Sequence, residues 1–369
     1  MLWVGAFFCF NVLQPVYMWS FASASNILSL GVILLLCIKH FRIDNFDFAK
    51  LLYIIVYIIL ASLAAQNFLG FLGCALLPFL MMSDENFLYE LYDRFVTIFV
   101  VFTTISLMVY VLVVLGAPLG YTIIPPLNPL QEITYRYYPF MVTMNSADYY
   151  RFMGMFDEPG AMGTLSGVLL LMNKLKLSDK RNVLILLFGF FSFSLFFYLV
   201  LGAYIVLFAP KKINIITFGI VFAVLLLPSN NILDQYIFSR IAFVDGEFVG
   251  DDRKVWNFDD VWFEHYKQSS DYYWGLGREA KAVYNSGGSS YVDLLIMYGL
   301  VFTVFYSFVF LYDATKRLAE NKKNIAIYLL IFSSVMYQRP YINNIGYLMM
   351  LYMPMVFLSK KTNNEYERK

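Results

Sequence analysis

Long apolar runs separated by short polar segments extend along the whole chain. A membrane-spanning helix needs roughly 20 consecutive apolar residues, and somewhat fewer where helices are short or paired. Counted in this way, the pattern predicts an all-α polytopic membrane protein, a single membrane domain over residues 1–369. The twelve expected helices lie near residues 2–19, 22–39, 51–66, 67–82, 95–115, 160–173, 183–198, 199–209, 213–228, 291–312, 325–338 and 345–358.

The composition agrees with this class. Hydrophobic residues make up 60% of the chain and charged residues 14%, with a mean hydropathy of +0.63, whereas a soluble domain carries about a quarter charged residues. The net charge of +1 gives no reason to expect a nucleic-acid partner. Cys9, Cys37 and Cys74 all lie in apolar runs, and no His, Asp or Glu cluster has the spacing of a metal site. Neither a metal nor a cofactor is therefore expected.

The distribution of basic residues predicts the orientation, because lysine and arginine concentrate in cytoplasmic loops. Most of the 27 lysines and arginines fall in six polar segments. Twelve spans place all six segments and both termini on one side of the membrane, which we expect to be the cytoplasm. The six segments are 39–50, 83–94, 174–181, 211–212, 316–323 and 360–369.

Two long segments then face outward, and we expect the chemistry there. Residues 116–159 hold six of the twelve prolines, which favours irregular structure over a further membrane helix. Residues 229–290 form the longest polar interruption of the chain. This second loop carries three of the five tryptophans and one of the two histidines.

The first outward loop ends in candidate site residues. Pro159 is suited to the first turn of a helix, because its missing N–H would be unpaired there anyway. Glu158 stands where a carboxylate can cap that helix, or hold a substrate group or a proton. Arg151 offers a permanent cation near the same helix start, which favours an anion site.

The second loop offers further cations and a possible base. Arg240, Arg253 and Arg278 could each bind phosphate, or could pair with the ten acidic residues of 229–290. His265 is the only outward-facing histidine under this topology. Its ordinary pKa lies near neutrality, so it is either a general base or a surface residue.

Several of these segments resemble a known family. RFMGMFDEPGAMG (151–163), followed by SRI, GDDRK, YWGLGREA and GGSSYVDLLIMYGL in the second loop and the helix after it, is similar to the bacterial O-antigen polymerase (Wzy-type) family, which is related to the O-antigen ligases. The resemblance implies a GT-C-like inner-membrane glycosyltransferase. Such an enzyme moves a growing glycan from undecaprenyl diphosphate to a lipid-linked repeat unit at the periplasmic face, without a metal.

The resemblance also implies roles and partners. The diphosphate would be bound by arginines, and the acceptor hydroxyl would need one base, for which Glu158 and His265 are the candidates. The expected partners are the undecaprenyl-diphosphate-linked oligosaccharide, membrane lipids, and a chain-length regulator and a flippase of the same pathway. The arginines in question are Arg151, Arg240, Arg253 and Arg278.

Three other functions stay open. An O-antigen ligase would use the same donor with lipid A core as acceptor, and sequence separates the two poorly. A polysaccharide flippase or other transporter would be expected to keep charges inside its helices at the midplane, and the apolar runs here are nearly free of charge. A scaffold for a polysaccharide assembly complex would need no single essential arginine.

Overall fold

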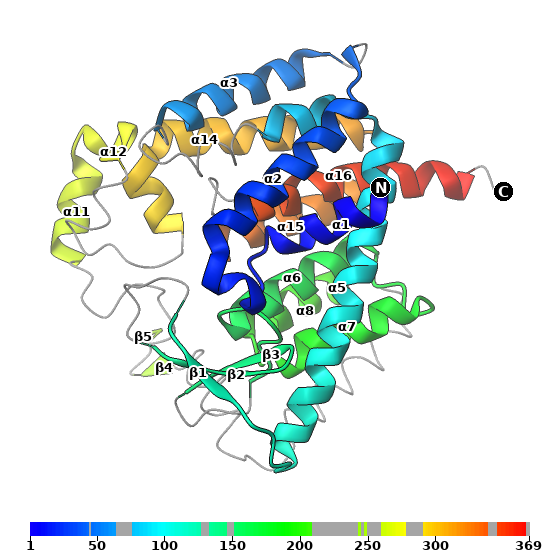
Figure 1. The fold of residues 1–369 in the computed structure, drawn as a ribbon. Helices are drawn as coiled ribbons and strands as arrows, with labels where there is room; N and C mark the ends of the chain where they lie inside the picture. The colour runs from blue at the N-terminus through cyan, green and yellow to red at the C-terminus, as the bar shows by residue number, and fades with distance from the viewer. Residues whose placement is uncertain are drawn as a thin grey trace. The chain divides into compact units, whose positions relative to one another are not determined.

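The computed structural model is dominated by helices, with two small antiparallel sheets (Figure 1). The residues that the structure describes are 1–43, 46–63, 76–126, 133–145, 151–208, 243–244, 247–248, 260–277, 291–338 and 345–366. In chain order the helices are α1 (Leu2–Asn11), the 3-10 helix η1 (Val16–Phe21), α2 (Ala22–Lys39), α3 (Phe48–Leu63), α5 (Glu85–Val114), α6 (Pro159–Met172), α7 (Lys180–Phe191), α8 (Leu195–Phe208), α11 (Asp260–Gln268), α12 (Asp271–Trp274), α14 (Tyr291–Arg317), α15 (Lys322–Gln338) and α16 (Ile345–Tyr366). The strands are β1 (Thr122–Ile124), β2 (Tyr135–Tyr138), β3 (Met141–Met144), β4 (Phe243–Val244) and β5 (Glu247–Phe248).

The helices have the length and composition of a membrane protein. Within the described residues, three stretches are long and apolar enough to cross a bilayer: Val16–Lys39, Glu85–Val114 and Tyr291–Arg317. Five shorter apolar helices accompany them, which are Leu2–Asn11, Phe48–Leu60, Pro159–Met172, Leu195–Phe208 and Gly346–Ser359. A helical membrane protein is therefore the right class, and the count of twelve spans stays a prediction.

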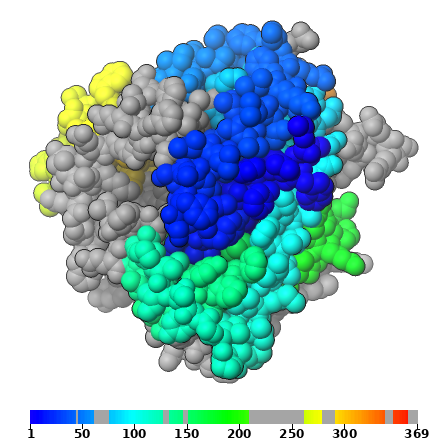
Figure 2. Space-filling view, viewed as in Figure 1, coloured from blue at the N-terminus to red at the C-terminus, as the bar shows by residue number. Residues whose placement is uncertain are grey.

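Apolar side chains are exposed on the surface of these helices. In Figure 2 the blue residues of α2 and α3 form part of the molecular surface. There Leu28 is 59% exposed, Leu35 68% and Ile58 55%. In a membrane protein such exposed apolar side chains face lipid, because contact with hydrocarbon has no free-energy cost for them, unlike contact with water.

The chain divides into two compact units. Unit 1 comprises Met1–Leu13, Ser23–Arg94 and Asp252–Lys369, and unit 2 comprises Gln14–Ala22 and Phe95–Asp251. In unit 1, α14 packs against α3, α15 and α16. Tyr53 lies at the centre of this core, with its ring edge-on to the rings of Phe310 (5.2 Å between centroids) and Tyr352 (6.0 Å).

Unit 2 is built on α6. This helix packs against α7 and α8, and nearly all of its residues are buried. The segment before it forms the sheet β1-β2-β3, with Tyr135 opposite Met144 and Arg136 opposite Thr143. The Val142 amide donates to the Gly154 carbonyl (2.9 Å) and so ties the sheet to the chain that enters α6.

The segment 116–159, which was predicted to face outward, is thus less irregular than expected. The described part holds no membrane helix, as its prolines led us to expect, but the residues YRYY and MVTM pair as antiparallel strands. The all-α prediction omits this sheet and the β4–β5 hairpin.

The predicted loop 83–94 is wrong, because α5 begins at Glu85. Asp84 caps it: one carboxylate oxygen accepts from the amides of Asn86 (2.9 Å) and Phe87 (3.0 Å). The charges in this stretch lie on helical turns, where Arg94 pairs with Glu90. The charged residues of 83–94 therefore do not indicate a loop, because most of them lie on a helix.

The predicted helix 2–19 is also wrong as one element. α1 ends at Asn11, and Gln14 takes a positive φ of 59° before Pro15. Proline lacks the amide that an α-helix needs at this point and disfavours helical geometry in the residue before it. The chain therefore re-enters a helix only at Val16.

The boundary predicted between 183–198 and 199–209 lies several residues too late. α7 starts at Lys180 because the Asp179 side chain accepts from the Arg181 amide (2.9 Å). The turn falls at residues 192–194, where Phe193 has a φ of 46° and the Ser194 amide donates to the Ser192 hydroxyl.

The remaining helix predictions are confirmed to within a few residues at most ends. They are 22–39, 51–66, 160–173, 291–312, 325–338 and 345–358, with α14 and α16 extending further toward the C-terminus than expected. Residues 76–82 are helical as predicted, whereas 64–75 and 213–228 lie outside the described residues.

Candidate functional site

The start of α6 places the predicted carboxylate as the sequence suggests. Glu158 is the N-cap residue, with extended backbone (φ −153°, ψ 153°), and Pro159 occupies the first turn. The Glu158 side chain does not bond the first-turn amides. Its carboxylate is half-buried and is not used as a helix cap.

Tyr135 is a site residue that the sequence did not reveal. It is 2% exposed, and Trp19 packs edge-on against its ring at 5.1 Å. Burial, and then the negative charges of Asp157 and Glu158, raise the pKa of Tyr135 above its ordinary value. We call Trp19, Tyr135, Asp157 and Glu158 the Tyr135 cluster. The rings of Trp19 and Tyr135 are in contact, and Asp157 and Glu158 act on Tyr135 electrostatically.

Arg151 is held by the turn between α7 and α8. Its Nε donates to the Ser192 carbonyl and its Nη2 to the Phe193 carbonyl, both at 3.3 Å. The side chain is half-buried. These contacts use two of the five N–H groups of a guanidinium. Arg151 thus clamps a turn with unusual backbone geometry, a role the sequence gave no reason to expect.

The other predicted residues are distributed differently. His265 lies on α11 in unit 1 and is exposed, whereas Arg151 and Glu158 share unit 2. Arg240, Arg253 and Arg278 lie outside the described residues. The convergence of the four arginines on one ligand therefore stays a prediction.

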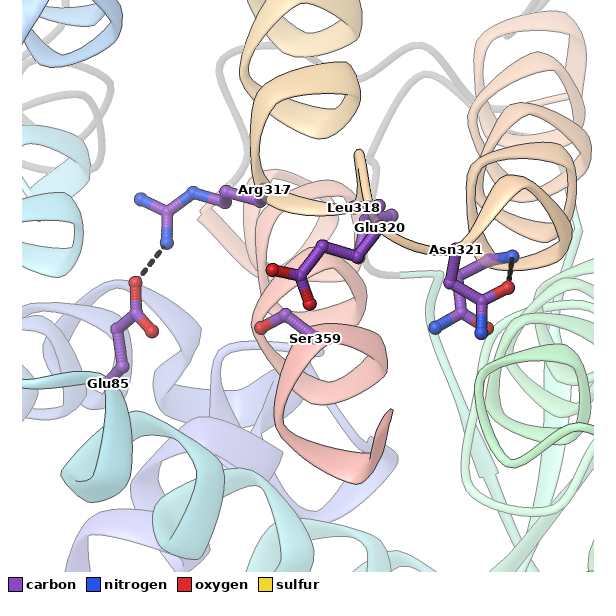
Figure 3. Close-up of a pocket in the computed structure, with 7 residues that line it drawn as sticks. Glu85, Arg317, Leu318, Glu320, Asn321 and Ser359 are labelled. Carbon is purple, nitrogen blue, oxygen red and sulfur yellow. Dashed lines mark hydrogen bonds and ion pairs between the residues drawn. The ribbon is translucent and has the colours of Figure 1, made fainter. Parts of the chain in front are cut away.

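A buried charge cluster in unit 1 was also not foreseen. Arg317 donates to Asp313 Oδ1 (2.8 Å), to Glu85 Oε1 (2.5 Å) and to the Tyr352 hydroxyl (3.1 Å). Figure 3 shows Glu85 and Arg317 facing each other across this region. The Asp313 side chain is only 2% exposed. The i,i+4 spacing of Asp313 and Arg317 was the available sequence signal.

Two cavities adjoin this cluster. One of about 200 Å³ is lined by Glu85, Arg317 and polar residues around Asn321 (Figure 3). The other, about 370 Å³, adds Asp47 and Lys316, which form a 2.5 Å ion pair. Burial opposes ionisation of Asp47, but hydrogen bonds from Lys316 and from a backbone amide outweigh it and lower the pKa.

Acidic and basic groups balance around the larger cavity, which is lined by Phe46, Asp47, Lys50, Glu85, Asp313, Lys316 and Arg317. Lys316 pairs with Asp47, and Arg317 pairs with both Glu85 and Asp313. The arrangement therefore ties helix ends together and does not present excess charge to a ligand. Across the described part of the chain, no three His, Cys, Asp or Glu side chains group in a way that could hold a metal ion.

Comparison of the chain with protein-family models, curated proteins and solved structures finds no match.

Proposed function

We propose that this protein is a membrane-embedded glycan polymerase. It transfers a growing polysaccharide, an O-antigen or capsule, from undecaprenyl diphosphate to a lipid-linked repeat unit at the periplasmic face of the bacterial inner membrane. Both termini are cytoplasmic in this proposal, and 116–159 and 229–290 are periplasmic. The observation that carries the proposal is that 151–163, the segment with family resemblance, holds a half-buried arginine bonded to the α7–α8 turn and a half-buried glutamate at the N-cap of an apolar helix.

The reaction releases a negatively charged diphosphate at the membrane surface, and the protein must stabilise that charge. The acceptor hydroxyl oxygen bonds to the anomeric carbon of the donor, and the bond from that carbon to the diphosphate oxygen breaks. Undecaprenyl diphosphate leaves with the electron pair, and the hydroxyl proton passes to a base. Arginines can stabilise the diphosphate through fixed, charge-assisted hydrogen bonds without a metal.

The described residues support a division of roles. Arg151 contributes positive charge from the segment that leads into α6, where it is bonded to the turn between α7 and α8. The first-turn amides of α6 favour anions as well. Glu158 orients the acceptor hydroxyl or accepts its proton. Trp19, which is half-buried, provides an aromatic face against which a sugar ring can pack, and the buried Tyr135 supports it edge-on.

His265 is the alternative proton acceptor, on an exposed face of α11. Arg240, Arg253 and Arg278 complete the diphosphate site in this proposal. A chain-length regulator and a flippase would act with the enzyme, since the donor must reach the outer face and the product needs a defined length.

Deletion of the gene tests the proposal in a cell that makes the polysaccharide. Lipopolysaccharide with a single repeat unit on the core supports a polymerase. Bare core with long lipid-linked polymer would instead identify a ligase, and repeat units trapped at the cytoplasmic face would identify a flippase. Complementation with Arg151→Ala should restore few or no long chains, whereas Arg151→Lys should restore some, because it keeps the charge but loses the planar fork.

A further inference from the structure

The long helix α14 is broken inside its apolar stretch. Gly299 has a φ of 76° and a ψ of 169°, far from helical values, while helix continues on both sides. Such a break deprives the preceding carbonyls of their intrahelical donors. An unpaired carbonyl is costly in a membrane, because hydrocarbon offers no water to satisfy it.

Three successive carbonyls before the break are satisfied by one distant segment. The Leu276 amide donates to the Ile296 carbonyl (2.8 Å), and the Gly277 amide to the Met297 carbonyl (3.1 Å). The Tyr266 hydroxyl lies 2.9 Å from the Leu295 carbonyl. All three donors belong to residues 260–277, which carry α11 and α12 (Figure 1). We call these residues the capping segment.

Two glycines allow the capping segment to approach so closely. A Cβ built on Gly299 would lie 2.5 Å from the Gly275 nitrogen, and one built on Gly275 would lie 2.6 Å from the Met297 carbonyl oxygen. Real Cβ atoms do not come so near to backbone. Both glycines also have positive φ, which other residues rarely adopt.

Tyr266 contributes to this contact both through its hydroxyl group and through its apolar ring. Its ring is 4% exposed and packs with Val292 and Ile296 in a small hydrophobic cluster, with Trp262 stacked on it at 5.3 Å. Burial, followed by the charge of Asp271, raises the pKa of Tyr266 to about 12. The hydroxyl therefore remains a protonated donor at physiological pH.

We infer that the break in α14 is a docking site for the capping segment, and that Tyr266 is the residue that positions it. The docked segment carries one residue of the predicted site. His265 precedes Tyr266 on α11 and is exposed while Tyr266 is buried, so it faces away from the docked surface. The catalytic consequence rests on the proposed function, whereas the docking does not.

Hydrogen–deuterium exchange of the purified full-length protein in detergent tests the docking. In the wild type, the amides of Leu276 and Gly277 should be protected. Tyr266→Phe keeps the ring but removes the hydroxyl, and should raise the exchange of these amides about fivefold, the effect of one hydrogen bond. Tyr273→Phe, in the same segment but 51% exposed, is the matched control and should leave exchange unchanged. Unchanged exchange in Tyr266→Phe overturns the inference.

Gly299→Ala provides a second test, because its methyl group would displace the segment. Exchange should rise at 276–277 and stay at wild-type values in α16, which shows that the rest of unit 1 is folded. In a polymer-synthesis assay, Tyr266→Phe should lower kcat several-fold with little change in KM. Equal kcat in Tyr266→Phe and Tyr273→Phe overturns the positioning role. A wild type that makes no polymer overturns the proposed function instead, and exchange still decides the docking.

Discussion

Replacement of Arg317 by methionine should destabilise unit 1 strongly. The substitution removes three hydrogen bonds and leaves the Asp313 carboxylate, 2% exposed, without its cation. Breaking a buried ion pair from one side typically costs about 3–5 kcal/mol. The adjoining cavity of about 370 Å³ lets water approach the cluster, which favours the lower end of this range. We therefore expect a loss of about 3 kcal/mol in the free energy of unfolding.

The matched control is Lys316→Met, one residue earlier on the same helix end. The Lys316–Asp47 pair is 49% and 34% exposed at its two side chains. Pairs of this exposure contribute about 0–1 kcal/mol. The comparison thus separates burial of the ion pair from simple loss of a positive charge.

A double variant, Asp313→Asn with Arg317→Met, removes the uncompensated charge. It should recover more than half of the stability that Arg317→Met loses, because a neutral amide is far less costly to bury than a carboxylate. Equilibrium unfolding of the purified protein in a mild detergent measures all three variants. The reasoning is refuted if Arg317→Met is no less stable than Lys316→Met, or if the double variant is as unstable as the single one.

Three further predictions concern Gly163, Asp47 and His265. Gly163→Ala should lower the free energy of unfolding by about 1–3 kcal/mol, because its Cβ would lie 2.4 Å from the Ser194 Cβ. Gly202→Ala, with open space around the added methyl group, should not lower it. The pKa of Asp47 is lowered in the folded protein, so its ionised carboxylate stabilises the fold above about pH 4. This stability is lost as the pH falls through the pKa of Asp47 in the folded state. Asp47→Asn should therefore make the free energy of unfolding less dependent on pH in this range. In a pH–rate profile, an acid limb that vanishes in His265→Ala identifies His265 as the base, while full activity in that variant excludes it.

Sequence periodicity predicted most of the helices because apolar runs report burial or lipid contact directly. Pro159 marked the start of α6 correctly, since its ring and missing amide suit only the first turn. The same reasoning failed where a single polar residue decides a boundary. Asp84 caps α5 and turns a charged stretch into helix, although charge density suggested a loop.

Other features depend on contacts between distant parts of the sequence. Gly299 lies in an apolar run that reads as one continuous helix, and donors from residues 266–277 bond the carbonyls that precede the break. Tyr135 looks like one aromatic residue among many until the fold buries it against Trp19, where the charges of Asp157 and Glu158 act on it. Arg151 was predicted to meet a ligand anion, whereas backbone carbonyls of a distant turn take two of its donors. Local pattern carries no information about such long-range partners.

The most direct test of the central claim is polymer synthesis by the purified protein. The protein in detergent or liposomes would be given an undecaprenyl-diphosphate-linked repeat unit from the same organism, with no metal added and no lipid A core present. The proposed function predicts a ladder of lipid-linked oligomers together with released undecaprenyl diphosphate. A repeat unit that stays unextended under these conditions, but is transferred once lipid A core is supplied, would contradict it.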